Sequence, residues 1–300
     1  MKHFFAVICV ALLFSAMFSI VHAQNDTPSV ELAGFRWNKT TLNALLISNE
    51  SEPWWQTYFV SLTQRSVMQW NQAFQYFATN YPEYSYMVAI NMILDVSNQT
   101  LPDYDIYINF SRSIQLGGGD ALGLTTTIPY INGTIEKVLV NLSAQNGAID
   151  LTNSNEQDVC DHELGHALGL GHSNSSKDLM YPYYDVYSSN EAISTLDLYG
   201  IANCFSWLTS PVDLIDNNPL PKFVALPQSL TYEYAPVTNP APKGIGDNPI
   251  VRTLLILLSN PYTAAMVYAF IVFLVVAILV YLNLRRRPRR IRVAPHQGAM

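Results

Sequence analysis

The sequence predicts an α+β domain of roughly 175 residues, which is long enough for one sizeable core. Three observations support this fold class. Segments near residues 35–47, 84–95, 105–110, 122–127 and 138–143 are rich in β-branched and aromatic residues and indicate strands. A long helical pattern covers residues 53–79. Two further helices are expected after the strands, at residues 156–168 and 189–202.

The helix at residues 53–79 is expected to back the sheet. Pro53 suits a first helical turn, since its missing N–H has no partner there. Its apolar side chains can share one buried stripe, which favours a core role over a binding site: Trp55, Phe59, Leu62, Met68 and Phe74.

The two ends of the chain carry long apolar runs. Residues 1–23 are typical of a secretory signal peptide with cleavage after Ala23, and a retained N-terminal anchor is the alternative. Residues 24–208 form the predicted domain, and the proline-rich residues 209–262 are predicted to be an extended stalk. Residues 263–284 are apolar enough for a membrane helix, and six arginines in residues 285–300 favour a basic cytoplasmic tail over a nuclear-localisation or nucleic-acid patch.

Charge and sequons favour a cell-surface location, with the N-terminal domain outside the cell. The segment between the apolar runs holds all 23 acidic residues and nine of the 16 basic ones, which disfavours nucleic acid as a partner. N-linked glycans are expected, because all eight Asn-x-Ser/Thr sites fall in the same segment. The sites begin at Asn25, Asn38, Asn49, Asn98, Asn109, Asn132, Asn141 and Asn174.

The cysteines allow one disulfide outside the signal peptide. Cys9 lies within residues 1–23, which leaves Cys160 and Cys204 as an even pair in an oxidising compartment. A bridge between them is the favoured interpretation, and two buried free thiols are the alternative.

The segment from His162 to His172 predicts a catalytic metal site. On a helix, His162 and His166 project from one face and can share one Zn²⁺, and Glu163 lies beside them where its carboxylate can reach a zinc-bound water. Gly169 can end the helix with a sharp turn that returns His172 as a third ligand. Three protein ligands leave one position open, which is typical of catalytic rather than structural zinc.

A census of histidines supports this interpretation. The chain has six, and the three outside the motif are His3, His22 and His296, all in the terminal segments. Every histidine of the predicted domain is therefore a proposed ligand.

The residues after His172 resemble the matrixin branch of the metzincin zinc peptidases. Ser173 follows the third histidine and Met180 lies eight positions after it, as in the family's Met-turn. The resemblance implies a twisted mixed sheet, a long backing helix, a zinc-binding helix and a C-terminal helix. It also implies one catalytic zinc ion above an apolar floor formed by Met180.

Further roles follow from the same resemblance. Pro182 and Tyr184 match the wall of the pocket for the side chain after the scissile bond. Asp197 matches an aspartate that supports the Met-turn, although it also suits a helix N-terminus as an acid favoured by the helix dipole. The run from Gly119 to Leu124 is similar to the substrate-pairing edge strand, with Leu122, Gly123 and Leu124 expected to bind substrate.

Calcium is a second metal to consider. Asp103, Asp105 and Asp120 offer the hard oxygen ligands that Ca²⁺ takes, and solvated loop acids are the alternative interpretation.

The sequence therefore predicts a membrane-anchored extracellular zinc endopeptidase that acts on proteins or peptides, with Glu163 as general base. The alternative is a non-catalytic surface glycoprotein or adhesin built on a metzincin-like domain. A purely structural zinc module conflicts with an open fourth position on the metal.

Overall fold

The computed structural model describes residues 27–146, 149–184, 192–209, 219–237 and 261–285. The predicted signal peptide at residues 1–23, Asn25, most of the predicted stalk and the tail beyond residue 285 lie outside them. The chain divides into two units, residues 1–242 and 243–300.

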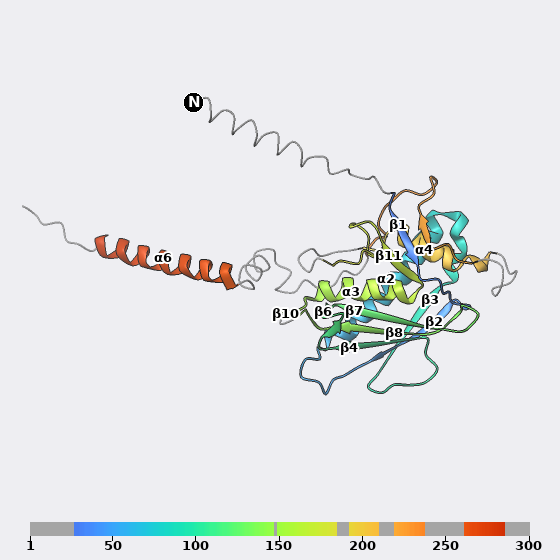
Figure 1. The fold of residues 1–300 in the computed structure, drawn as a ribbon, viewed down its shortest axis with the longest axis horizontal. Helices are drawn as coiled ribbons and strands as arrows, with labels where there is room; N and C mark the ends of the chain where they lie inside the picture. The colour runs from blue at the N-terminus through green and yellow to red at the C-terminus, as the bar shows by residue number, and fades with distance from the viewer. Residues whose placement is uncertain (1–26, 147–148, 185–191, 210–218, 238–260, 286–300) are drawn as a thin grey trace, which may run out of the picture. The chain divides into compact units, whose positions relative to one another are not determined.

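The first unit contains a five-stranded mixed sheet in the order β3-β2-β4-β8-β7 (Figure 1). β2, β3, β4 and β8 are parallel, and β7 runs antiparallel to β8 at one edge. This confirms the α+β class. The strands are β2 (Thr41–Ile47), β3 (Asn91–Ser97), β4 (Ile106–Ser111), β7 (Gly123–Pro129) and β8 (Ile135–Ser143).

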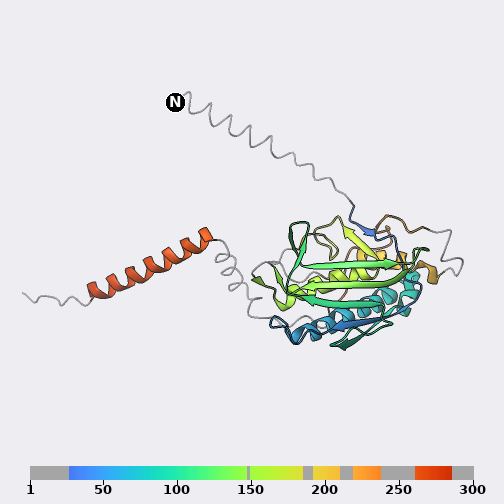
Figure 2. The ribbon, with the colours of Figure 1, turned by 60° about the horizontal axis from the view of Figure 1, so that its bottom comes forward.

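Two long helices, α2 (Tyr58–Asn80) and α3 (Asn153–Ala167), pack against each other and against the sheet (Figures 1 and 2). Phe59 of α2 stacks on Phe110 of β4 with ring centroids 4.2 Å apart. Trp70 of α2 is fully buried and its indole N–H donates to the carbonyl of Asp161 in α3 at 3.0 Å. The core between helices and sheet therefore fixes where α3 lies.

The remaining elements are shorter, apart from α6 at the C-terminal end of the chain. They are β1 (Ser29–Leu32), the 3₁₀ helix η1 (Pro82–Ala89), β5 (Ile114–Leu116), β6 (Gly119–Ala121), β9 (Gln145–Asn146), β10 (Ile149–Asp150), β11 (Leu170–Ser173), α4 (Thr195–Cys204), η2 (Ser206–Leu208), β12 (Phe223–Ala225) and α6 (Pro261–Arg285).

The boundaries of the first helix and of two strands differ from prediction. α2 begins at Tyr58, so Pro53 is not in its first turn; Trp55 instead packs edge-on against Phe59 and Phe110. Met68 is 36% exposed, because the buried stripe passes through Trp70 instead. The segment predicted as a strand at residues 84–95 starts inside the 3₁₀ helix η1 and becomes a strand only at Asn91. The strand predicted at residues 35–47 is regular only from Thr41.

The last helix is also shorter than predicted. It begins at Thr195 because the Ser194 hydroxyl accepts hydrogen bonds from the amides of Leu196 and Asp197, which caps the helix N-terminus.

Cys160 and Cys204 are both buried and free, so the predicted disulfide is wrong. Cys204 Sγ lies 3.7 Å from the carbonyl oxygen of Gly169, just beyond the C-terminal end of α3. Cys160 lies in the middle of the same helix. The helical rise of about 1.5 Å per residue puts nine residues on the order of 13 Å apart, well beyond the Cα separation of under about 7 Å that a disulfide needs.

Part of the predicted stalk folds onto the domain. β12 pairs with β1, and β1 pairs in turn with β11, which gives a three-stranded antiparallel sheet in the order β11-β1-β12. Leu230 and Ala235 are buried. The proline-rich composition predicts an extended spacer, but at residues 219–237 apolar side chains between the prolines pack against the domain.

The predicted membrane span falls on α6, a helix of 25 residues in the second unit. Within the part of the chain that the structure describes, no helix combines the length and hydropathy needed to cross a bilayer.

Candidate metal centre and active-site cleft

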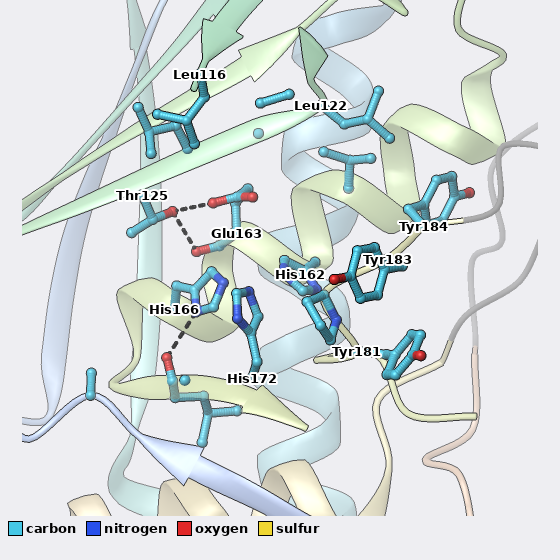
Figure 3. A pocket seen from close by; sticks show the side chains of 18 of the residues that line it. Leu116, Leu122, Thr125, His162, Glu163, His166, His172, Tyr181, Tyr183 and Tyr184 are labelled. Carbon is cyan, nitrogen blue, oxygen red and sulfur yellow. Dashed lines mark hydrogen bonds between the residues drawn. The ribbon is translucent and has the colours of Figure 1, made fainter. Parts of the chain in front are cut away.

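Three histidines converge beside α3 (Figure 3). His162 and His166 lie one turn apart on α3, and a capping box of Thr152 and Asn155 starts this helix. Gly169 then adopts a φ of +112°, which a side chain would strain, and the chain turns into β11 with His172. One nitrogen from each ring lies within 4.8 Å of the others. Among the described residues, this is the single cluster of three or more His, Cys, Asp or Glu groups placed to hold a metal ion.

Backbone carbonyls orient two of these rings. His162 Nδ1 lies 2.6 Å from the carbonyl oxygen of Leu179, and His166 Nδ1 lies 2.9 Å from that of Leu170. With a proton on each Nδ1, each Nε2 has a free lone pair for a metal. Burial lowers the pKa of His162 to about 4 and that of His166 to about 3, so both rings are neutral at pH 7. Neutral, converging and pre-oriented imidazoles fit a zinc ion.

Glu163 points into the same space from α3 (Figure 3). Its side chain is 95% buried, and burial raises its pKa to about 7. The Thr125 hydroxyl on β7 lies 2.6 Å from Glu163 Oε2 and 3.1 Å from its carbonyl oxygen, so it can donate to either. Thr125 was not predicted as a site residue, because nothing near it in sequence points to Glu163.

Replacing Thr125 with Val is expected to lower kcat about tenfold with little change in KM, since one hydrogen bond that holds the carboxylate is lost. Steady-state kinetics on a peptide substrate measures this. Thr126→Val is the matched control, because Thr126 is exposed and does not line the cleft. Wild-type kcat in Thr125→Val would show that the contact does not position Glu163.

A cleft of about 740 Å³ opens over the histidines. The edge strand β7 and the residues before it form one wall, including Leu122, Gly123 and Leu124; Pro182 and Tyr184 line another. Tyr184 is held in place because its hydroxyl donates to Asp158 Oδ2 at 2.7 Å and accepts from Asn155 Nδ2 at 3.1 Å. The structure thus brings these five predicted substrate-binding residues to one cleft.

Met180 lies under α3. It is fully buried, and a Cβ built at Gly165 would come within 2.5 Å of its sulfur. Because Gly165 lies between His162 and His166 in sequence, the thioether packs directly against the turn that carries both ligands.

Asp197 caps α4, and its carboxyl also lies beside that of Asp178 in the Met-turn. Its Oδ2 accepts from the Ser194 amide at 2.8 Å. Burial and the neighbouring carboxylate of Asp178 raise the pKa of Asp197 well above its ordinary value. The contact with the Met-turn runs through Asp178, whose Oδ1 accepts from the Met180 amide at 3.2 Å and whose Oδ2 accepts from Ser194 Oγ at 2.8 Å. The sequence alone does not predict a role for Asp178. Only the capping pattern Ser194-x-x-Asp197, to which Asp178 bonds in the folded chain, is visible in the sequence.

The three aspartates considered for calcium do not come together as a cluster among the described residues. Asp105 pairs with Lys39 Nζ at 2.5 Å and accepts from the Asn43 amide. Asp120 accepts a hydrogen bond from Gln115 within the β5–β6 hairpin. The carboxylates of Asp105 and Asp120 therefore serve local contacts.

Two known proteins are similar to parts of this chain. Karilysin of Tannerella forsythia is 38% identical over 77 residues, which are 24% of this chain and 15% of karilysin. The hatching enzyme of Paracentrotus lividus is 45% identical over 47 residues, which are 16% of this chain and 8% of that enzyme. The aligned parts thus span a small fraction of either relative's length.

A family model described as Matrixin matches residues 57–206, which is half of the 300-residue chain and includes all three histidines, Glu163, Met180 and the cleft walls. The chain therefore belongs to the matrixin family of zinc metallopeptidases.

Proposed function

We propose that this protein is a zinc endopeptidase that hydrolyses peptide bonds in proteins or peptides. The observation that carries the proposal is the convergence of three imidazoles with a buried carboxylate in one open cleft. His162, His166 and His172 would hold the ion. When bound there, zinc acts as a Lewis acid and makes water nucleophilic near neutral pH.

Glu163 is the proposed general base. Its carboxylate accepts the proton of the attacking water and passes it to the leaving amine. Burial raises the pKa of Glu163, whereas a bound zinc ion would favour the ionised carboxylate that accepts this proton. Thr125 holds the carboxylate toward the edge strand.

β7 is the proposed binding strand for substrate. β7 is the last strand of the five-stranded sheet, and only one of its two edges pairs with another strand of that sheet, β8. An extended peptide can add to this edge through main-chain hydrogen bonds, and the side chain after the scissile bond would enter the pocket lined by Leu122, Pro182 and Tyr184.

Digestion of a mixed peptide library tests the proposal. The full-length protein should produce defined cleavage products by mass spectrometry, and a zinc chelator should abolish them. Adding zinc back should restore them, because the metal supplies the electrophile. A lack of chelator-sensitive cleavage across broad pH would favour the adhesin alternative.

We further propose that the domain faces the outside of the cell and that residues 263–284 attach it to a membrane. The support is in the sequence: two apolar terminal runs, the arginine cluster that follows the second, and the sequons between them. Protease digestion of intact cells should remove the domain but leave a tag placed after residue 300. Release of the protein by carbonate washing would exclude a membrane span.

The sequons differ in accessibility. Asn38, Asn98 and Asn132 are exposed and are the proposed glycan sites. Asn49 Nδ2, the atom that a glycan would occupy, donates to Asn109 Oδ1 at 3.0 Å and to the Phe110 carbonyl at 3.2 Å. A glycan at Asn49 would therefore disrupt the pairing beside β4, and peptide mapping after glycosidase treatment should find this site unmodified.

A further inference from the structure

Residues 223–235, called the strap below, pack against the domain although they lie outside the family match at residues 57–206. One end of the strap is β12, which pairs with β1, and β1 pairs with the strand that carries His172. The other end packs at the start of α4. There the Thr195 amide donates to the Glu233 carbonyl and the Ala235 amide donates to the Ile193 carbonyl, each at 2.8 Å.

The strap also contacts the helix behind the site. The hydroxyls of Tyr76 and Tyr81 both donate to Glu233 Oε1, at 2.9 and 2.8 Å. Through Tyr76, which lies in α2, and Tyr81, which follows its last residue, these bonds join the helix to the strap. They hold the side chain of Glu233, the neighbour of Tyr232 in sequence.

The Tyr232 hydroxyl reaches the Met-turn. It lies 3.1 Å from Asp178 Oδ2 and 3.3 Å from the carbonyl oxygen of Lys177. Asp178 is 1% exposed, and its carboxylate accepts from Tyr232, Ser194 and the amide of Met180 and lies beside the buried carboxyl of Asp197. Because a buried carboxylate without partners is costly, each of these donors helps to decide where Asp178 sits.

The position of Asp178 sets that of Leu179. Leu179 lies between Asp178 and Met180, and its carbonyl oxygen is the acceptor 2.6 Å from His162 Nδ1. The Met180 carbonyl accepts from the Ser173 amide at 2.7 Å, which joins the same turn to the residue after His172. A shift of Asp178 therefore moves the acceptor that orients one ligand and loosens the turn bonded beside another.

We propose that Tyr232 is a positioning residue of the zinc site, which acts through Asp178 and the Leu179 carbonyl on the ring of His162. The strap is then part of the metal centre, although the family match ends before it. This inference rests on the proposed function only for the presence of zinc at the triad.

Zinc release from the full-length protein tests the proposal. Tyr232→Phe keeps the ring but removes the hydroxyl, and its zinc should transfer to a fluorescent chelator about tenfold faster than that of the wild type. This is the lower end of the effect of losing a partner that orients a ligand. Tyr234→Phe is the matched control, because the Tyr234 hydroxyl donates to the same Lys177 carbonyl, at 2.8 Å, rather than to Asp178. The control should release zinc at the wild-type rate.

Two further measurements separate positioning from simple stability. Thermal unfolding of the zinc-free proteins reports any loss of packing alone. 4-Aminophenylalanine at position 232 restores a donor and should bring zinc release back to within about twofold of wild type. Zinc release at the wild-type rate from Tyr232→Phe overturns the proposal, as does equal acceleration in Tyr234→Phe. No substrate is used, so an inactive protein with Tyr232-dependent zinc release would refute the peptidase proposal and leave this inference standing.

Discussion

Glu163→Gln should leave zinc bound at one ion per chain and lower kcat/KM by about 10³-fold, within the range that general acid–base catalysis contributes. Gln fills nearly the same space and can still accept from Thr125, but it cannot take a proton from water. Zinc content by elemental analysis and peptide hydrolysis measured side by side would show the two effects separately.

Glu136→Gln is the control for this variant. Glu136 is exposed on β8 and does not line the cleft, so the same chemical change there should leave kcat/KM unaltered. Normal turnover by Glu163→Gln would remove Glu163 from the mechanism, and loss of zinc from it would mean that the carboxylate supports the metal rather than the proton transfer.

Gly123→Ala should reduce kcat/KM about 100-fold with less than about 1 kcal/mol loss of folding stability. A Cβ at Gly123 would come within 2.3 Å of Glu163 Oε1, much closer than real contacts allow. The Glu163 side chain can swing away at little cost to the fold, but it then leaves Thr125 and the attacking water. Kinetics and thermal unfolding, measured together, test this separation.

Gly119→Ala provides the comparison. Gly119 lies in β6, which precedes β7 in sequence, and a Cβ added there meets nothing within 4 Å. This variant should keep both activity and stability. If Gly123→Ala were fully active, the carboxylate would have a second productive position and its contact with the edge strand would be unimportant.

Features set by short-range geometry were predictable. The spacing of His162, His166 and Gly169 follows from helix periodicity and from the turn that glycine permits, and α3 begins and ends within a few residues of prediction. The long helix and the strand-rich segments were likewise recognisable from side-chain patterns. Their boundaries were less accurate, because Trp55 and Tyr84 pack against other rings rather than continuing a regular element.

Features set by long-range contacts were missed. Thr125 and Glu163 are 38 residues apart, and Tyr232 and Asp178 are 54 apart, so no local pattern links them. The disulfide was predicted from the even number of cysteines. In the folded chain Cys204 lies at Gly169, beyond the end of α3, whereas Cys160 lies in the middle of that helix. The strap was taken for a stalk because its prolines resemble those of a spacer, whereas its tyrosines and Glu233 bond to α2 and the Met-turn.

The amino-acid order alone was enough to predict the three converging histidines, the buried Glu163 beside them and the family, because those groups occupy fixed positions on one helix and the turn after it. Which groups hold them in place depended on the folded chain. Buried polar atoms must find partners wherever packing brings them, so the supports of Glu163 and His162 come from β7 and from a C-terminal strap that composition had assigned to a spacer.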